Sequence, residues 1–351
     1  MKKTKWVIVA IVLVGLVFVI FALAQNKIKK EILYTKGTGV PHKTFEDEFL
    51  VHKKCSEWWY NTGYFEDENG NEYAFQFTIT KLKLFGVPVY SLLTSLTDLQ
   101  TEKHYFGSER VFFGKGVKQT DEISSFGAKA KLEYAPNKFS SFGSQKLSIN
   151  EETYQLSLNI EAQKAPVWHC DNGTLLMGVT DDPKEVTFYY SITNMLANGT
   201  LILDGKEHKV SGKAWFDKQG GTFNPMSPKT HWEWFSFRFF DNEEIMLFSF
   251  PQGNYNDGTY IKNSGEYQRL NNYEVTPHEI IVEPTTGKNY SSGWTVRMPG
   301  VKDEVYSLRP KVNGQFNNAF YEIMADVYNK DGKLVGYCIV ELLPGARNEK
   351  I

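Results

Sequence analysis

The chain has 351 residues, and its formal net charge is only −2. This balance creates no overall electrostatic field that would attract nucleic acid or an anionic surface, so no nucleic-acid partner is expected. Aromatic residues make up 15% of the chain, which suits either β-sheets with large inward side chains or an apolar ligand cavity.

The chain begins with an apolar segment that no charge interrupts from residue 6 to residue 24. As a helix this segment spans roughly 28 Å, close to the thickness of a bilayer core. The Ala-Leu-Ala sequence at 22–24 also fits a signal cleavage site, although the apolar run exceeds the usual ~7–15 residues. We therefore expect residues 1–30 to be a membrane anchor or a signal, followed by a stalk over 31–44. Both alternatives place the remaining chain outside the cytoplasm, membrane-anchored or secreted.

The first predicted β-hairpin carries the most distinctive stretch of the chain. Residues 57–65 read Glu-Trp-Trp-Tyr-Asn-Thr-Gly-Tyr-Phe, and residues 73–80 are rich in aromatic and β-branched side chains. The Asn-Gly pair between these segments supplies the positive φ values of a tight turn. Strand, turn and strand are therefore predicted here.

A related pattern follows at residues 231–250. Aligning Trp59-Tyr60 on Trp234-Phe235 brings the polar turns of both hairpins into register, which predicts two copies of one β unit. Two glycines and two prolines between 219 and 228 are expected to break any strand and to mark the boundary between the copies.

Short alternating segments fill both units, and the clearest period-two pattern is Tyr154 to Ile160. Turn signals separate these segments, and no amphipathic helix is predicted between residues 45 and 220. Many short strands with such spacing indicate barrels or sandwiches. The sequence therefore predicts an all-β fold with one domain over 45–222 and a second over 223–345.

The sequence contains no recognisable metal or redox motif. Its seven histidines are scattered without a zinc-binding spacing, so neither a metal nor another cofactor is predicted. Three cysteines leave at least one unpaired, and three buried thiols are expected. A bridge between Cys55 and Cys338 is the alternative.

The Glu-Trp-Trp-Tyr-x-x-Gly-x-Phe hairpin resembles the opening of the lipocalin-like family of the carotenoid 1,2-hydratases and the AttH-like predicted secreted hydrolases. Later segments agree in order, namely Phe188–Ser191, Gly212–Asp217, Trp234–Ser236 and Thr286-Gly287 followed by Tyr290 and Trp294. The resemblance covers residues 45–344. It implies two tandem lipocalin-like antiparallel β-barrels after the N-terminal apolar helix.

Asp217 is the leading candidate for a catalytic residue. It ends a predicted strand beside Trp215 and Phe216, near the expected domain boundary, where clefts form. Desolvation by these rings would raise the pKa of its carboxyl toward that of a general acid. The resemblance implies a role in protonating an isoprenoid double bond. The alternative is a structural aspartate that caps a turn or accepts backbone hydrogen bonds.

The chain departs from the hydratase pattern around this aspartate. The hydratases place a tyrosine two residues before the aspartate and a His-x-Trp sequence upstream. Here Trp215 occupies the tyrosine position, the upstream strand reads Phe188-Tyr189-Tyr190, and Lys218 stands where many secreted relatives have histidine. These departures argue against carotenoid hydration itself.

Glu57 is the second catalytic candidate. It is expected either to form an acid–base pair with Asp217 or to be a structural partner of an indole N–H or an arginine. The ligand-binding residues expected from the same aromatic segments are Trp58, Trp59, Tyr190, Trp215, His231, Trp232 and Trp234. For His231 the alternative is an ordinary surface histidine.

Three functions follow from these observations. The first is extracytoplasmic binding of an apolar ligand, such as an isoprenoid or a lipid, close to the membrane that the N-terminal helix would contact. The second is a hydratase- or hydrolase-type enzyme with Asp217 as proton donor. The third is a non-catalytic structural or interaction module. An enzyme requires polar groups that converge at one site, whereas a carrier requires only an apolar cavity.

Overall fold

The computed structural model describes residues 45–49, 51–52, 55–84, 87–112, 122–124, 129–134, 143–179, 182, 185–224, 227–317 and 320–347. The expected membrane or signal segment and the stalk lie outside the described residues. Within the described ranges, we find no helix with the length and apolar character needed to cross a membrane.

The first half of the chain forms an antiparallel sheet of 12 strands, preceded by the short helix α2 (Phe45–Phe49). Its main path runs β4-β3-β2-β1-β12-β11-β8-β7-β6-β5, and β9 and β10 pair with β11. The strands are β1 (Ser56–Asp67), β2 (Glu72–Leu84), β3 (Val87–Asp98), β4 (Lys103–Phe112), β5 (Glu122–Ser124), β6 (Ala130–Tyr134), β7 (Ser144–Asn150), β8 (Tyr154–Ala162), β9 (Val167–Trp168), β10 (Thr174–Leu176), β11 (Val186–Leu203) and β12 (Lys206–Thr222).

The second half forms a separate sheet of 10 strands, with the main path β16-β15-β14-β13-β22-β21-β19-β18-β17 and with β20 pairing β21. The strands are β13 (Glu233–Phe239), β14 (Glu244–Phe250), β15 (Tyr255–Ile261), β16 (Tyr267–Leu270), β17 (Glu274–Val282), β18 (Asn289–Arg297), β19 (Val305–Pro310), β20 (Phe316–Asn317), β21 (Phe320–Asn329) and β22 (Leu334–Leu342).

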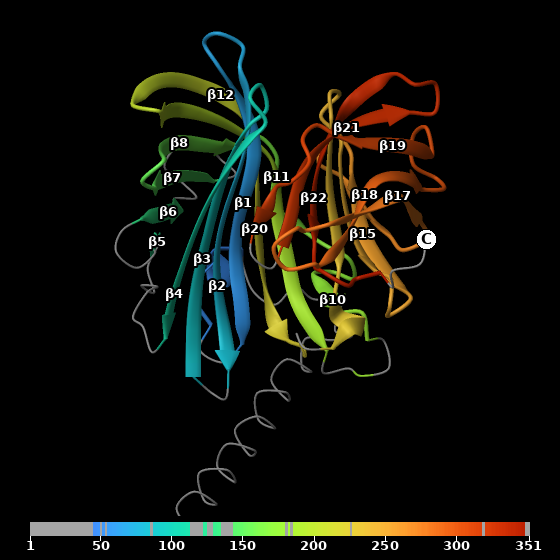
Figure 1. Cartoon of the computed structure of the whole chain (residues 1–351). Helices are drawn as coiled ribbons and strands as arrows, with labels where there is room; N and C mark the ends of the chain where they lie inside the picture. Colours follow the sequence, from blue (N-terminus) through green and yellow to red (C-terminus); the bar gives the residue numbers. More distant parts are fainter. Residues whose placement is uncertain are drawn as a thin grey trace, which may run out of the picture.

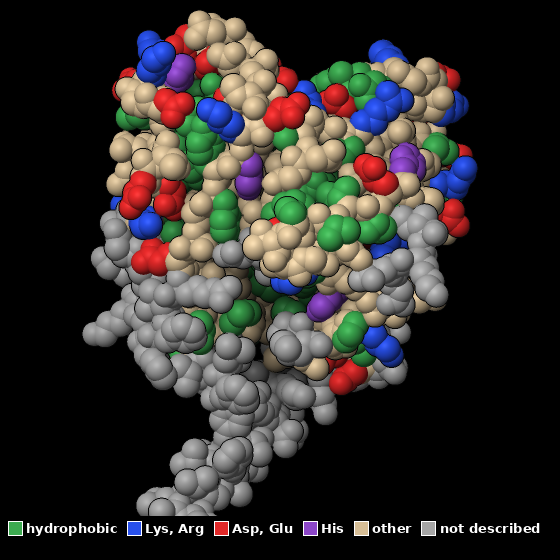
Figure 2. Space-filling model, viewed as in Figure 1, with side chains coloured by type: hydrophobic (Ala, Val, Ile, Leu, Met, Phe, Trp, Pro, Cys, Tyr) green, Lys and Arg blue, Asp and Glu red, His purple; other side chains and the backbone are tan. Residues whose placement is uncertain are grey.

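The predicted all-β fold class is confirmed. The two sheets lie side by side, the first on the left and the second on the right of Figure 1. Each sheet curls around its own apolar core, and the two lobes meet along a notch at the upper edge of the face in Figure 2. Within the described residues, the first path ends at β4 and β5 and the second at β16 and β17, so each unit is a curled half-barrel.

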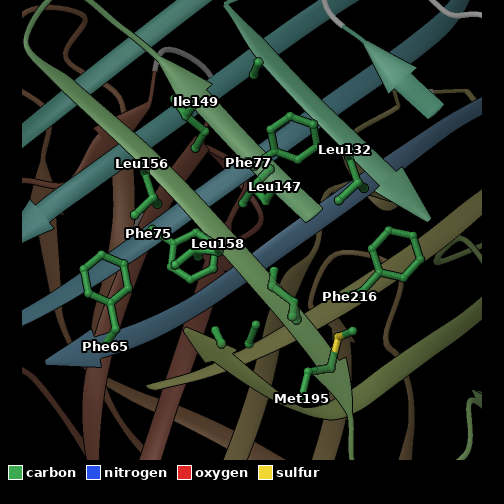
Figure 3. Packing of buried hydrophobic residues seen from close by; sticks show 14 of the residues in the cluster. Phe65, Phe75, Phe77, Leu132, Leu147, Ile149, Leu156, Leu158, Met195 and Phe216 are labelled. Atoms are coloured by element: carbon green, nitrogen blue, oxygen red, sulfur yellow. The ribbon is translucent and has the colours of Figure 1, made fainter. Parts of the chain in front are cut away.

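The core of the first unit follows from strict alternation along its strands. In β8 every second side chain from Tyr154 to Ala162 is buried and the intervening ones are exposed, as the sequence pattern predicts. Figure 3 shows Leu156 and Leu158 of this strand packing against phenylalanines of β1 and β2. Each buried side chain of this size contributes about 1.5–3 kcal/mol, which fixes the strand register.

The registers of the two hairpins correct the expected internal alignment by three residues. Trp59 is part of the first core, whereas Trp234 packs between the two sheets. The Asp67 N–H bonds to the Asn71 oxygen, and the Phe239 N–H bonds to the Glu243 oxygen, so Asp67 and Phe239 are counterparts at the two turns. Because side chains of a strand alternate between faces, an odd shift exchanges the two faces.

Gly220 and Gly221 do not break β12 as predicted, because the strand continues to Thr222. A Cβ atom at Gly220 would lie 2.7 Å from the Cβ atom of Glu57, and one at Gly221 would lie 2.3 Å from a backbone oxygen of β11. These glycines therefore allow close approach of three neighbouring strands. The three cysteines are free and buried, so the alternative of a bridge between Cys55 and Cys338 is wrong.

Candidate functional site

The two sheets pack against each other through aromatic side chains, and we call this cluster the seam. Its first-sheet members come from β10 and the residues around it and from the faces of β1, β11 and β12 that point away from the first core, and its second-sheet members come mainly from β13 and β14. The buried members are Tyr60, Cys170, Leu175, Met177, Tyr189, Trp215, Trp232, Trp234, Met246, Phe248, Phe250 and Ile339.

Strand β1 and the start of β13 contribute two aromatic pairs to the seam. The rings of Trp58 and of Trp232, the residue before β13, stack with centroids 6.1 Å apart. Two residues further along the chain in each case, Tyr60 meets Trp234 edge to face at 5.5 Å. Such aromatic pairs contribute about 0.5–1.5 kcal/mol each beyond their buried area. The seam is therefore a rigid, apolar layer.

Asp217 lies inside this apolar layer and is 4% exposed. Its Oδ1 atom accepts hydrogen bonds from the Trp215 indole N–H at 2.5 Å and from the Ser191 hydroxyl. Its Oδ2 atom accepts a hydrogen bond from the Tyr189 hydroxyl at 2.8 Å. The register explains the arrangement, because Ser191 of β11 and Tyr60 of β1 are the direct cross-strand neighbours of Asp217.

Burial raises the pKa of Asp217 to about 7. The hydrogen bonds from Ser191, Trp215 and Tyr189 act in the opposite direction but do not outweigh the loss of hydration. At neutral pH the carboxyl group therefore exists in both the protonated and the ionised form, which is the condition for efficient general acid catalysis.

His169, which follows β9, extends the hydrogen-bond network of Asp217. Its Nε2 atom lies 2.7 Å from the Ser191 hydroxyl, and its Nδ1 atom is buried without a hydrogen-bond partner. Burial lowers the pKa of His169 to about 3, so the imidazole is neutral. Ser191 therefore connects a neutral imidazole to the Asp217 carboxyl.

A second pair of acids faces the seam from the other sheet. Glu322 of β21 and Glu341 of β22 are cross-strand neighbours, and Glu341 accepts a hydrogen bond from the Trp232 indole N–H at 2.8 Å. Burial raises the pKa of Glu341 to about 7, and the charge of Asp217 raises it as well. Carboxyl groups from both sheets are therefore close enough to interact electrostatically.

Glu57 is not paired with Asp217, which corrects the expected acid–base pair. It lies on the opposite face of the first sheet, inside the half-barrel, where Lys218 donates a hydrogen bond at 2.7 Å and Lys81 donates another. The His52 imidazole lies 2.9 Å from the same carboxylate. Burial works to raise the pKa of Glu57, but Lys218, His52 and Lys81 outweigh it and lower the pKa to about 2. Glu57 is therefore a structural residue, as the alternative prediction states, but its partners are lysines and not an indole N–H or an arginine.

The expected ligand-binding residues divide between the two faces. Trp58, Trp215, Trp232 and Trp234 belong to the seam, whereas Trp59 and Tyr190 belong to the first core. Outside both clusters, His231 places its Nδ1 atom 2.9 Å from the backbone oxygen of Pro344. The structure therefore brings four of the predicted tryptophans together with Asp217.

Sequence reasoning missed Tyr189, Ser191 and His169 as partners of Asp217. Tyr189 and Ser191 are two residues apart in a predicted strand, so the sequence indicates that both side chains point to the same face of the sheet. Nothing in the sequence signals that His169 reaches the same site, because the contact depends on the path of the chain between β9 and β10.

Two groups of side chains have the composition of a metal site. His52, Cys55 and Glu57 place ligand atoms within 4.8 Å of one another, as do Asp67, Glu68 and His208. In the first group, lysines already occupy the carboxylate, and burial raises the pKa of Cys55 to about 12. A protonated thiol and a neutralised carboxylate do not favour a cation.

A family model described as AttH-like matches residues 40–345. The fold is similar to that of the AttH protein NE1406 from Nitrosomonas europaea, with a TM-score of 0.75, 18% identity, and coverage of 87% of this chain and 98% of that one. It is also similar to kievitone hydratase from Nectria haematococca, with a TM-score of 0.69, 16% identity, and coverage of 88% and 94%. No curated protein sequence matches the chain.

Proposed function

Since this chain belongs to the AttH-like family, we propose that it is an acid–base enzyme that adds water to, or removes water from, an apolar substrate at the seam. The observation that carries the proposal is the buried Asp217 carboxyl, held by three side-chain donors in an aromatic layer. A carrier of apolar ligands would not require such a network. The similar fold of kievitone hydratase is consistent with hydration chemistry.

In the proposed hydration, protonated Asp217 transfers its proton to one carbon of a double bond, and a carbocation forms at the other carbon. The rings of Trp215 and Trp234, which lie 6.1 Å apart, stabilise the positive charge through their π faces. The oxygen of a water molecule then bonds to the cationic carbon, and its surplus proton passes to a carboxylate. Dehydration follows the same steps in reverse.

Of the two acids on the second sheet, Glu341 is the one suited to accept the proton from water, because burial and the charge of Glu341 keep Glu322 protonated. Burial raises the pKa of Glu341, so its carboxylate is a stronger base than an ordinary glutamate. Its position across the seam from Asp217 provides an acid from one sheet and a base from the other. The proton that Glu341 accepts returns to Asp217 before the next turnover, and Ser191, which lies 2.7 Å from His169 Nε2, donates a hydrogen bond that holds the Asp217 carboxylate in the meantime.

The proposal is tested by incubating the purified chain with a carotenoid, a short isoprenoid alcohol and kievitone, and by measuring gain of one water by mass spectrometry. Asp217→Asn should reduce turnover by about 10²–10⁴-fold. Asp331→Asn makes the same chemical change at an exposed turn and should leave turnover unchanged.

A measurement without substrate tests the premise directly. One component of the infrared carbonyl band of buried protonated carboxyls should titrate near pH 7 and be absent in Asp217→Asn, while the component from Glu341 remains. Full turnover by Asp217→Asn, or the same band in wild type and variant, would exclude Asp217 as the proton donor.

Binding of an apolar ligand without catalysis is the second candidate, and the stacked pair Trp58–Trp232 favours it. Native mass spectrometry should then detect a co-purified lipid or isoprenoid. We also propose an extracytoplasmic location, membrane-anchored or secreted, from the apolar sequence at residues 6–24. Fractionation of cells that express the full chain tests this proposal, because recovery in the cytosol would contradict it.

A further inference from the structure

Two adjoining surface clefts lie beside the turn that connects β13 and β14. The first has a volume of about 100 Å³, and Arg238 and Lys213 contribute to its lining. The second has a volume of about 170 Å³, and Val301 and Leu334 contribute to its lining. Phe239 and Phe240 line both clefts, so the two volumes meet at these rings.

Arg238 is a buried cation without an anionic partner. It is 4% exposed, and no carboxylate of the described residues lies within ion-pair distance of it. Its Nη2 atom makes only long contacts, 3.4 Å to the Thr62 oxygen and 3.5 Å to the Ser236 hydroxyl. Its Nε and Nη1 atoms have no hydrogen-bond partner. A guanidinium has five N–H donors, so three of them lack an acceptor.

Neighbouring rings do not replace the missing anion. The guanidinium carbon lies 5.5 Å from the Trp215 ring centre and 5.6 Å from that of Tyr337. Cation–π contacts at such distances stabilise the charge, but they leave the N–H donors unsatisfied. A planar oxyanion would satisfy several donors at once.

The other charged groups around the first cleft leave it with a positive excess. Glu244 is held by Lys164 at 2.7 Å and by Asn194 at 2.7 Å, so its charge is already compensated. Lys213 donates a hydrogen bond to the neutral Asn242 side chain at 2.7 Å. Arg238 and Lys213 therefore present two cationic groups to one small cleft.

The second cleft offers exposed apolar surface next to this positive charge. Phe240 is 61% exposed and Leu334 is 39% exposed, and both line this cleft, so they present adjoining apolar surface there. Two of the three acidic residues that line this cleft have partners, because Asp241 is paired with Lys302 and Glu243 accepts a hydrogen bond from Tyr260 at 2.5 Å, and the third is Asp303.

We propose that the two clefts together bind an amphipathic carboxylate. The carboxylate pairs with Arg238 and Lys213 in the smaller cleft, and the hydrocarbon chain lies over Phe239 and Phe240 toward Leu334. This site does not include the Asp217 carboxyl, although the charge of Arg238 also lowers the pKa of Asp217, and its occupation does not require the proposed reaction.

Isothermal titration calorimetry of the full chain with sodium octanoate tests the site. Octanol has the same chain without the charge, and acetate has the charge without the chain, so both should bind at least about tenfold more weakly than octanoate. Arg238→Gln should weaken octanoate binding by about tenfold or more. Arg309→Gln is the matched control, because Arg309 is exposed and lies 4.3 Å from the Tyr328 ring centre.

A second variant, Phe240→Ser, serves if Arg238→Gln does not fold, because Phe240 is exposed and its replacement should not disturb folding. The loss of its apolar contact should weaken octanoate binding several-fold. Equal binding of octanol and octanoate would overturn the proposal. Unchanged octanoate affinity in Arg238→Gln, or in Phe240→Ser, would also overturn it.

Discussion

Glu57 and Asp217 are both buried acids on the neighbouring strands β1 and β12, yet their chemistry is opposite. Glu57 is 0% exposed and has a pKa of about 2, whereas Asp217 is 4% exposed and has a pKa of about 7. The difference lies in their partners, because lysines surround Glu57 and mainly neutral donors surround Asp217. Burial alone therefore does not decide the protonation state of an acid, and the charge of its hydrogen-bond donors does.

The largest expected effect is the loss of stability when the Glu57 carboxylate is removed from between its lysines. Glu57→Gln leaves Lys81 and Lys218 buried without a counter-ion, so it should lower the free energy of unfolding by about 3–5 kcal/mol. Urea unfolding at neutral pH measures this loss. Glu266→Gln removes an exposed partner of Lys262 and should change stability by less than about 0.5 kcal/mol. A loss below about 1 kcal/mol for Glu57→Gln would mean that the ionic cluster is dispensable.

The second expected effect is a pH dependence of stability, which has opposite signs for Asp217 and Glu57. The pKa of Asp217 is about 7 in the folded chain and 3.8 as its ordinary value, so between these values the folded state binds more protons than the unfolded state. Stability should therefore fall as pH rises through this range, by roughly 2–4 kcal/mol. Glu57 has the opposite sign, because its stabilisation is lost as pH falls from 4.5 toward 2.

The variant Asp217→Asn isolates the contribution of Asp217 to the pH dependence of stability. Denaturant unfolding at a series of pH values should show a smaller decline between pH 3.8 and 7 in the variant, with the remainder coming from Glu341, and an unchanged decline at acid pH. Asp331→Asn, at an exposed turn, should show the same pH dependence of stability as the wild type in both pH ranges. Identical pH profiles for wild type and Asp217→Asn would contradict the assignment.

The smallest effect comes from one neutral donor. Trp215→Phe removes the indole N–H that lowers the pKa of Asp217, so this pKa should rise above about 7, at a cost in stability of about 1–2 kcal/mol. Infrared titration of the protonated carboxyl measures the shift. Trp294→Phe is the control, because that indole donates to Ser291 in the second core. An unchanged Asp217 titration in Trp215→Phe would show that the indole does not tune the acid.

The sequence predicts the fold class because β-strand alternation is a local property. The alternation from Tyr154 to Ile160 reports directly on which side chains face the core. Register between distant strands is not local, so the alignment of Trp59 with Trp234 was wrong by three residues. The expected pair of Glu57 with Asp217 was also wrong, because the two side chains lie on opposite faces of the first sheet. The desolvation of Asp217 was predictable from its aromatic neighbours.

The aromatic pairs between β1 and the start of β13 have a consequence for how the chain can be divided. Each unit covers the aromatic layer of the other, and each contributes the first strand of its own hairpin to the contact. Expression of either half alone would expose this layer to water and favour aggregation. The duplicated units are thus obligate partners, and an alteration of Tyr60 or Trp234 in one half must be accommodated by the other.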